Sequence, residues 1–236
     1  MRWIGKDRQI NGHILSGTEI FGNLAEEALD HVTRVSHRRP LAAGSSLFRQ
    51  GDPADAFCVL LEGGIKMVQI SPEGQQVVLR YIGPGEMFGA VALFCRTDYP
   101  ATAVAVTDGL AAIWSRDTAE MLLRRYPEIG ANALQVVGGR LQELQSRYRE
   151  LSTENVERRV ARTLLRLAAR PGRPVADDTR IDFPISRQDI AEMTGTTLHT
   201  VSRVISRWEG LGLVASGRMA LVLRRPQALS RIADDL

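Results

Sequence analysis

Two short helical patterns separated by a glycine, within residues 186–213, constrain the fold of this chain more than any other feature. Ser186 can cap the first helix, with Asp189 three residues later as its acidic partner. Gly195 is expected to end that helix, and Thr197 can cap the next one. Two capped helices joined by a short turn with a glycine are typical of a helix-turn-helix.

The spacing of apolar and polar residues supports this interpretation. Ala191 leaves room for the two helices to approach closely, and Gly195 supplies a left-handed turn residue. The second helix is expected to bury one side, formed by Val201, Val204, Ile205, Trp208 and Leu211. Its other side carries groups that can hydrogen-bond bases or phosphates, namely His199, Ser202, Arg203, Ser206 and Arg207. A solvated polar face on a generic three-helix unit is the alternative, but the turn residues and both faces together favour DNA binding.

A short hairpin follows this second helix. The turn 216–218 lies between the apolar runs 213–215 and 220–223, which gives a hairpin of the size of a wing. We therefore predict a winged helix-turn-helix domain over residues 156–236, which hold 14 basic and 9 acidic side chains. Residues 1–155 hold 16 basic and 18 acidic side chains. A basic module on a nearly neutral body is the charge pattern of a polyanion-binding domain attached to another domain.

The polar side chains of this domain provide candidate DNA contacts. Arg203 is predicted to read a guanine edge, because a guanidinium can donate two parallel hydrogen bonds there. Arg187, Gln188 and Thr197 are predicted to position phosphates, the last from a helix N-terminus. The full set of candidates is Arg187, Gln188, Thr197, His199, Thr200, Ser202, Arg203, Arg207 and Arg218.

Residues 40–115 have the pattern of a small antiparallel β domain. Turn signals recur about every ten residues, at Gly44, Gly51, Gly63, Gly74 and Gly83. The runs between and after these turns are short and rich in β-branched and apolar residues, which is typical of a barrel or sandwich. They are residues 57–61, 65–70, 77–82, 101–106 and 110–114, and each is a predicted strand. With a helical lead-in over residues 15–35, these runs predict a β-roll sensor domain over residues 1–125.

One segment after the β-rich region has the apolar spacing of a coiled coil. Its apolar residues recur at steps of three and four, at Leu134, Val137, Leu141, Leu144, Tyr148 and Leu151. This stripe is narrower than the buried face of most globular helices, so it favours a dimer seam along a helix over residues 126–155. A helix packed on its own domain is the alternative. Gly138 and Gly139 mark either a close approach of two backbones or a place where the helix can adjust.

The order of these elements resembles the Crp/Fnr superfamily of bacterial transcription regulators, over essentially the whole chain. Residues 185–195 are similar to the family's first DNA-binding helix and turn, and residues 48–53 and 85–89 resemble turns of its effector-binding roll. The resemblance implies an α+β fold: an antiparallel, cyclic-nucleotide-binding-like β-roll, a long dimerisation helix and a C-terminal winged helix-turn-helix. It also implies a homodimeric activator that binds a palindrome in double-stranded DNA, with RNA polymerase as a partner.

The residues expected to bind an effector depart from the family pattern. Where the cyclic AMP receptor protein has a glutamate for the ribose, this chain has Ala90, and the family's arginine for the cyclic phosphate falls at Ala101. Tight binding of cyclic AMP is therefore not expected, because both the cation and the acceptor are missing. The candidate effector pocket comprises Gly89, Ala90, Val91, Ala101 and Thr102.

The recognition helix also departs from that of family members that read TTGA-type half-sites. Those members carry Glu-x-x-Ser-Arg; here Ser202 and Arg203 match, which implies a TTG-like core. His199 replaces the glutamate and removes an acceptor for cytosine N4, so one base position is expected to change. Residues 196–203 look like the NnrR/DNR-type branch, which responds to nitric oxide in denitrification and includes members thought to sense through haem.

The identity of the signal stays open at the level of sequence. Two cysteines, Cys58 and Cys95, are too few for an iron–sulfur cluster or a four-thiolate metal site. Haem is one candidate cofactor, with ligands from the chain terminus or from the scattered set His13, His31, His37, Cys58, Cys95, Met67 and Met87. The three histidines are expected to be exposed and Cys58 buried. Cys95 is a redox candidate, because its loop can expose the thiol.

Several functional classes are disfavoured. No run of about 20 apolar residues could span a membrane, and the charged start lacks the apolar core of a secretory signal, so a cytoplasmic protein is expected. An enzyme with an incidental basic domain is a weak alternative, because no catalytic triad, metal-ligand cluster or phosphate-binding glycine loop is visible. The prediction is a DNA-binding regulator that responds to nitric oxide or redox state. A ligand-independent regulator and one controlled by a cyclic-nucleotide-like molecule are the alternatives.

Overall fold

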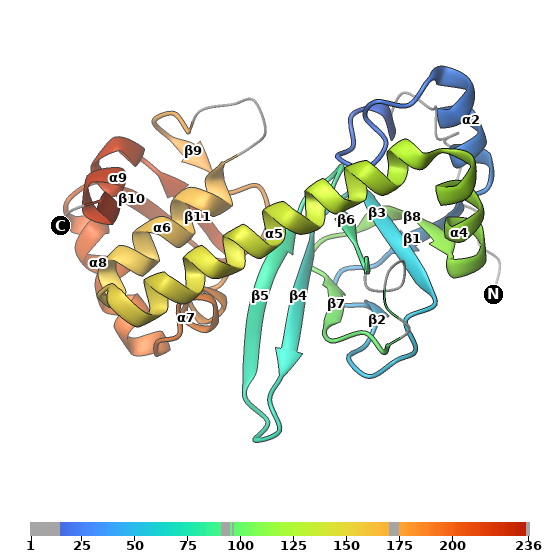
Figure 1. Cartoon of the computed structure of the whole chain (residues 1–236). Helices are drawn as coiled ribbons and strands as arrows, with labels where there is room; N and C mark the ends of the chain where they lie inside the picture. The colour runs from blue at the N-terminus through green and yellow to red at the C-terminus, as the bar shows by residue number, and fades with distance from the viewer. Residues whose placement is uncertain (1–14, 91–94, 96, 170–174, 235–236) are drawn as a thin grey trace.

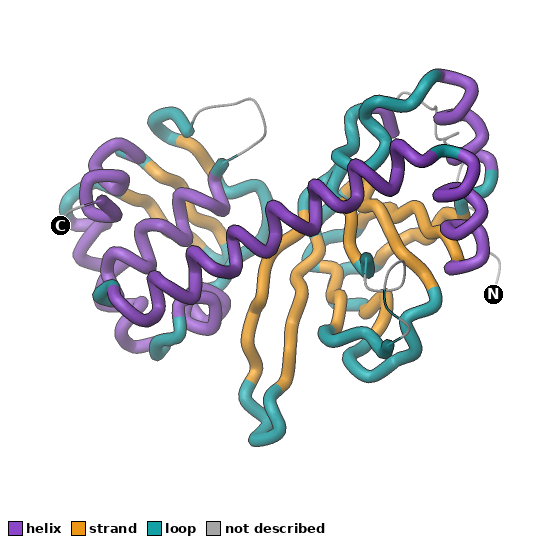
Figure 2. Tube along the Cα trace, viewed as in Figure 1, coloured by secondary structure: helices purple, strands orange, loops and turns teal. Residues whose placement is uncertain are grey.

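The computed structural model describes residues 15–90, 95, 97–169 and 175–234 (Figure 1). Strands predominate in the N-terminal part and helices in the C-terminal part, as Figure 2 shows. The helix α5 (Pro127–Thr153) runs between the two parts. This is the predicted α+β order of a β-rich domain, a long helix and a C-terminal helical domain.

Two four-stranded sheets form the N-terminal part, and every strand pair in them is antiparallel. The first sheet has the order β1-β8-β3-β6, with strands His37–Leu41, Gly109–Ser115, Ala56–Glu62 and Met87–Phe88. The second has the order β2-β7-β4-β5, with strands Ser46–Phe48, Thr102–Ala105, Ile65–Ile70 and Gln76–Ile82. The two sheets share one core, because Leu60 and Ala111 of the first pack in the same cluster as Ile65, Ile82 and Ala103 of the second.

The predicted strand runs match β3, β4, β5, β7 and β8, whereas β1, β2 and β6 are additional. β1 exposes four of its five residues and contains Pro40, so it has neither an apolar run nor an alternation that a sequence pattern could detect. Its position at the edge of the first sheet accommodates a proline, which cannot donate to a ladder.

An aromatic cluster anchors two helices on the other side of the first sheet. Trp114 of β8 is fully buried and stacks on Phe57 with 4.9 Å between ring centroids. Its indole N–H donates to the carbonyl of Val32 at 2.9 Å, and Val32 belongs to α2 (Glu26–Arg34). Helix α4 (Arg116–Arg125) adds Leu122 to the same cluster. The predicted helical lead-in is therefore part of the core of the β-roll.

The C-terminal part is a helical domain with a small three-stranded sheet of order β10-β11-β9. Its elements are α6 (Val156–Ala168), β9 (Thr179–Arg180), α7 (Arg187–Thr194), α8 (Leu198–Gly210), β10 (Val214–Gly217), β11 (Ala220–Leu223) and α9 (Pro226–Asp234). Helices α7 and α8 with the β10–β11 hairpin form the predicted winged helix-turn-helix. Val201, Val204, Ile205 and Trp208 are buried as predicted. The prediction for Leu211 is wrong: it lies beyond the last residue of α8, and 59% of it is exposed.

Helix α5 contacts both parts of the molecule. Near its start, Ile129 and Ala133 are buried in the core of the β-roll, and the amide of Asn132 donates to the carbonyl of Ile20 at 3.1 Å. Near its end, Glu150 is 5% exposed and accepts a hydrogen bond from Nη1 of Arg166 on α6 at 2.7 Å.

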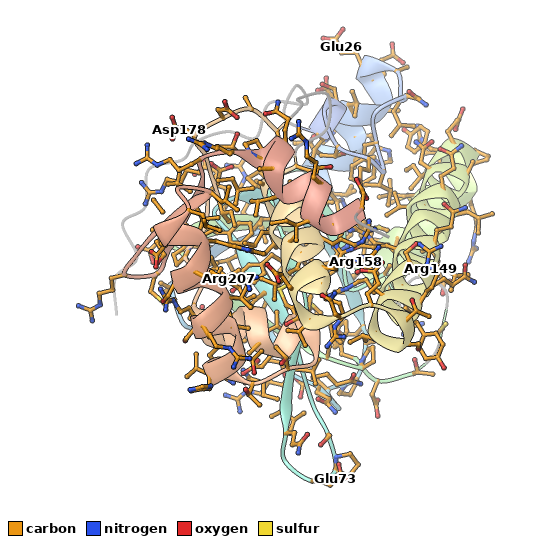
Figure 3. The ribbon with its side chains drawn as sticks, turned by 90° about the vertical axis from the view of Figure 1, so that its left-hand side faces the viewer. Glu26, Glu73, Arg149, Arg158, Asp178 and Arg207 are labelled. Carbon is orange, nitrogen blue, oxygen red and sulfur yellow. The ribbon has the colours of Figure 1, made fainter. Side chains whose placement is uncertain are left out.

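The β4–β5 hairpin forms a second connection between the domains (Figure 1). Lys66 Nζ on β4 lies 2.8 Å from Asp189 Oδ1 on α7. On β5 the ring of Tyr81 stacks on Phe183, just before α7, with 4.3 Å between centroids. Glu73 lies at the free tip of the hairpin, as Figure 3 shows. The C-terminal helical domain is thus held by a strand pair of the β-roll as well as by α5.

Across the described part of the chain, every helix is too short or too polar to cross a membrane.

Candidate nucleic-acid interface

Local capping fixes the relative position of α7 and α8. The hydroxyl of Ser186 accepts from the backbone N–H of Asp189 at 3.0 Å, and the Asp189 carboxylate accepts from the backbone N–H of Ser186 at 2.9 Å. Gly195 ends α7 with a φ of 61°, a left-handed conformation that favours glycine. Thr197 Oγ1 accepts from the backbone N–H of Thr200 at 3.2 Å and caps α8. The predicted caps and turn are therefore present.

The face of α8 opposite its buried side is polar and accessible. Thr197, His199, Arg203, Ser206 and Arg207 are exposed, and Thr200 and Ser202 are half-buried. Arg203 makes no hydrogen bond or ion pair with any residue that the structure describes. Its guanidinium is therefore available to a base edge without breaking an intramolecular contact.

Arg207 lies on the same helix but is already engaged. Its guanidinium pairs with Glu157 of α6, which also accepts from the indole N–H of Trp208 at 3.0 Å. Although partial burial acts to raise it, the bonds from Arg207 and Trp208 hold the pKa of Glu157 below its usual value. Figure 3 shows Arg207 on the side of the molecule turned toward the viewer. Unlike Arg203, Arg207 would have to break its ion pair with Glu157 to contact DNA.

Three further candidates lie beside α8. Arg187 begins α7, and its Nη2 donates to Ser216 Oγ at 3.0 Å. Gln188 is exposed and donates to Glu192 Oε1 at 3.0 Å. Arg218 is exposed in the tight turn of the β10–β11 hairpin. The predicted contacts thus come from the start of α7, the outer face of α8 and the wing.

The predicted seam on α5 is an apolar stripe without a cover. The exposed fractions are 70% for Leu134, 38% for Val137, 55% for Leu141, 62% for Leu144, 73% for Tyr148 and 49% for Leu151. A Cβ atom built on Gly138 or Gly139 would meet no atom within 4 Å, so the helix surface is open there as well. A run of exposed apolar side chains of this length is characteristic of an interaction surface.

A cavity of about 740 Å³ lies at the junction of the two domains. Its walls include Gly64 and Glu86 from loops of the β-roll, the stacked pair Tyr81 and Phe183, and Arg166 of α6. The cavity is not predictable from local sequence patterns, because its walls come from segments far apart in the chain. The only local signals were the turn glycines, which equally indicate ordinary loops.

Two family models match this chain, and together they account for its architecture. The model of the cyclic nucleotide-binding domain matches residues 38–126, and that of the Crp-like helix-turn-helix domain matches residues 158–232. The cyclic AMP receptor protein of Thermus thermophilus is 31% identical over 222 residues, which cover 94% of this chain and 100% of that protein. The chain belongs to the Crp/Fnr family of transcription regulators.

Other Crp/Fnr proteins agree with this assignment. The transcriptional activator protein anr of Pseudomonas aeruginosa is 26% identical, over 82% of this chain and 80% of that protein. The structure of FixK2 from Bradyrhizobium japonicum has the same fold, with a TM-score of 0.72 at 23% identity over 84% of this chain and 97% of that one. This Crp/Fnr protein is a DNA-binding transcription regulator and not an enzyme.

The cyclic nucleotide-binding family implies a nucleotide in the β-roll, and the residues there do not fit one. Ala101 is 2% exposed, and Ala90 offers no acceptor. A Cβ on Gly89 would lie 3.2 Å from the carbonyl of Ala56, and Phe48 stacks on Tyr99 with 3.8 Å between centroids beside it. Thr102 Oγ1 accepts from the backbone N–H of Gln50 at 3.0 Å, and Val91 lies outside the described residues. The described candidates therefore supply no cation for a cyclic phosphate.

The candidate haem ligands lie in different environments, and in the described part of the chain no group of three His, Cys, Asp or Glu side chains could hold a metal ion. His37 is exposed as predicted, but the prediction for His31 is wrong: it is half-buried, with Nδ1 2.9 Å from the hydroxyl of Tyr126. Cys58 is buried, and burial raises the pKa of its thiol, which disfavours the thiolate that binds metals. Cys95 is exposed.

Met87 and Met67 also lie apart. Met87 is buried in the cluster around Trp114, whereas Met67 packs against the core between the two sheets. His13 lies outside the described residues. The burial of Cys58 and Met87 and the exposure of His37 and Cys95 therefore do not favour a haem site at these residues.

Proposed function

We propose that this regulator binds a palindrome with TTG-like half-sites as a homodimer, with Arg203 reading the guanine. The observation that carries the proposal is the state of the arginines around α8: Arg207 is paired with Glu157, whereas Arg203 is exposed and unpaired among the described residues. A bidentate arginine–guanine contact is the commonest specific contact in the major groove. Ser202 precedes Arg203 and His199 lies one turn before it, so both contribute to the choice of the neighbouring bases.

Backbone contacts complete the proposed interface. Thr197 offers the N-terminus of α8 to a phosphate, Arg187 and Gln188 approach from the start of α7, and Arg218 approaches from the wing. Such contacts orient a protein on DNA without choosing its sequence. The division of roles makes base specificity depend on few side chains.

The dimer is proposed to form along α5. Its exposed stripe has the step of three and four that places apolar side chains against a second helix. A helix of 27 residues is about 40 Å long, so two copies can bury the whole stripe between them. Pairing of the helices places two recognition helices on one duplex, which is the geometric reason for a palindromic site.

The signal is proposed to act on the junction between the domains. Two contacts join the β-roll to the segment that carries α7: the Lys66–Asp189 ion pair and the Tyr81–Phe183 stack. The cavity lies at the same junction. A change in the β-roll or in the packing of α5 near Gly138 can shift the population of domain orientations through these contacts.

Nitric oxide or redox state is the proposed signal, and activation through RNA polymerase is the proposed outcome. The resemblance of residues 196–203 to the nitric-oxide-responsive branch supports nitric oxide as the signal, and the exposed thiol of Cys95 supports redox state as the signal. The absorption spectrum of the purified protein, with and without haem and nitric oxide, separates haem-based from thiol-based sensing. A Cys95→Ser variant that keeps its redox response would exclude the thiol.

The test of the main proposal is selection of binding sites from random duplexes, followed by footprinting. We expect an inverted repeat with a TTG-like half-site and two protected regions about one helical turn apart. An asymmetric site bound by a monomer would contradict the proposal. Strong binding by the colourless, untreated protein would instead support the ligand-independent alternative for the signal.

A further inference from the structure

One hydrogen-bonded cluster joins the first DNA-binding helix, the recognition helix and the wing. Glu209, in the last turn of α8, accepts from the backbone N–H of Ser216 at 3.0 Å and from its hydroxyl at 2.5 Å, both through Oε1. Oε2 of Glu209 accepts from Nη2 of Arg187 at 3.3 Å. The same Nη2 donates to Ser216 Oγ at 3.0 Å. Three segments that are separate in sequence thus meet at one carboxylate.

The charge state of this cluster is stable at neutral pH. The hydroxyl of Ser216, its backbone N–H and the neighbouring Arg187 hold the pKa of Glu209 below its usual value, against the opposing effect of partial burial. Glu209 is therefore ionised whenever the protein meets DNA. Its side chain is 32% exposed and that of Arg187 is 33% exposed, so the pair lies at the surface without being freely mobile.

The guanidinium of Arg187 has N–H donors that the cluster does not use. Nη2 donates to Glu209 and Ser216, and among the described residues the only contact of Nη1 is a long one of 3.5 Å with Ser206 Oγ on α8. An arginine has five N–H donors in a rigid plane. The donors that the cluster does not use remain for a phosphate beside the exposed face of α8.

We propose that Glu209 is a positioning residue for DNA binding: its carboxylate, fixed by the wing, holds Arg187 in the orientation that contacts the DNA backbone. This inference rests on the proposed role of Arg187 as a phosphate contact and adds the residue that prepares it. A side chain that is already ordered loses less conformational entropy when DNA binds. The cluster also ties the wing to α7 and α8, so that the phosphate contacts from the three segments keep one register.

Simple electrostatics predicts the opposite effect of removing this carboxylate. A negative charge near the binding surface repels DNA, so neutralising it should tighten binding if it has no other role. The sign of the effect of Glu209→Gln therefore separates a positioning residue from an incidental surface charge.

The experiment measures binding of the full-length protein to a 30-base-pair duplex of random sequence, labelled for fluorescence anisotropy, between about 50 and 200 mM salt. Arg187→Met should weaken binding and lower the salt slope by about one. Glu209→Gln should weaken binding by about 2- to 10-fold, the range that corresponds to the freedom of one long side chain. In the Arg187→Met background, Glu209→Gln should cause no further loss. Glu120→Gln, which removes the carboxylate of an ion pair on α4, is the matched control and should leave binding unchanged.

The outcomes distinguish failure of the positioning role of Glu209 from failure of the proposed phosphate contact by Arg187. If Arg187→Met binds as well as the parent protein, the phosphate role of Arg187 fails and the positioning role falls with it. If Arg187→Met is weak but Glu209→Gln binds equally or more tightly, only the positioning role is overturned. Equal losses from Glu209→Gln in both backgrounds would show a structural role and would also overturn it. Ser216→Ala, which removes only the supporting hydroxyl, should give a smaller loss in the same direction and serves if Glu209→Gln fails to fold.

Discussion

At the scale of single residues, the engagement of each arginine decides what it can contribute to DNA binding. Arg203→Ala should cost about 1–3 kcal/mol on the selected site and leave binding to random DNA nearly unchanged, because a base contact is lost and no folded contact is broken. Arg207→Ala is the matched control on the same helix. It breaks the pair with Glu157 and should not change the preferred sequence. Anisotropy titrations on both duplexes provide the measurement, and an equal loss on random DNA would contradict base reading by Arg203.

The two left-handed glycines that flank α8 offer a second test at this scale. Gly195 and Gly212 have φ values of 61° and 65°, so alanine at either position is strained by about 1–2 kcal/mol. A Cβ on Gly195 would also lie 2.9 Å from Cδ2 of Leu151, whereas one on Gly212 meets no atom within 4 Å. Gly195→Ala should therefore lower the free energy of unfolding more than Gly212→Ala does. Denaturant titration measures both losses. Identical losses would mean that the Leu151 side chain moves aside without any loss of stability.

At the scale of elements, the features that depend only on residues close in sequence were predictable. The caps at Ser186 and Thr197 and the turn at Gly195 follow from spacings of a few residues, so the helix-turn-helix was predictable in detail. The cluster at Glu209 was not, because its partners are brought together by the hairpin of the wing. Leu211 shows the limit of helical periodicity: the predicted stripe continues in sequence, but the helix ends before it.

The exposed stripe of α5 is the element whose role is easiest to test. Leu141→Glu places a charge in the centre of the proposed seam and should convert a dimer into a monomer that no longer binds the palindrome. Gln142→Glu adds the same charge to an exposed neighbouring position and should leave the dimer intact. Analytical ultracentrifugation measures the oligomeric state. A Leu141→Glu protein that stays dimeric with unchanged affinity would show that α5 does not form the seam.

At the scale of the whole molecule, Lys66 links the β-roll to the DNA-binding domain through the capping box of α7. Its partner Asp189 is 4% exposed and also accepts from Ser186. Although burial acts to raise it, the bonds from Lys66 and Ser186 hold the pKa of Asp189 below its usual value. The stabilisation is therefore fully present above the unfolded pKa of about 4 and is lost as the pH falls through the lower folded value.

Lys66→Met should lower the free energy of unfolding by about 3 kcal/mol, because it leaves a buried carboxylate without its cation while it keeps the length of the side chain. The loss should be full at neutral pH and should shrink as the pH falls through the folded-state pKa of Asp189 in the variant, which is higher than in the parent because Lys66 no longer lowers it. Lys66→Met/Asp189→Asn should recover part of the loss, since no uncompensated charge remains. The same contact holds α7 against the β-roll. The signal should therefore change the DNA affinity of Lys66→Met by a different factor than it changes that of the parent protein. Unfolding measured against pH distinguishes this link from a surface ion pair, whose removal would cost less than about 1 kcal/mol at every pH.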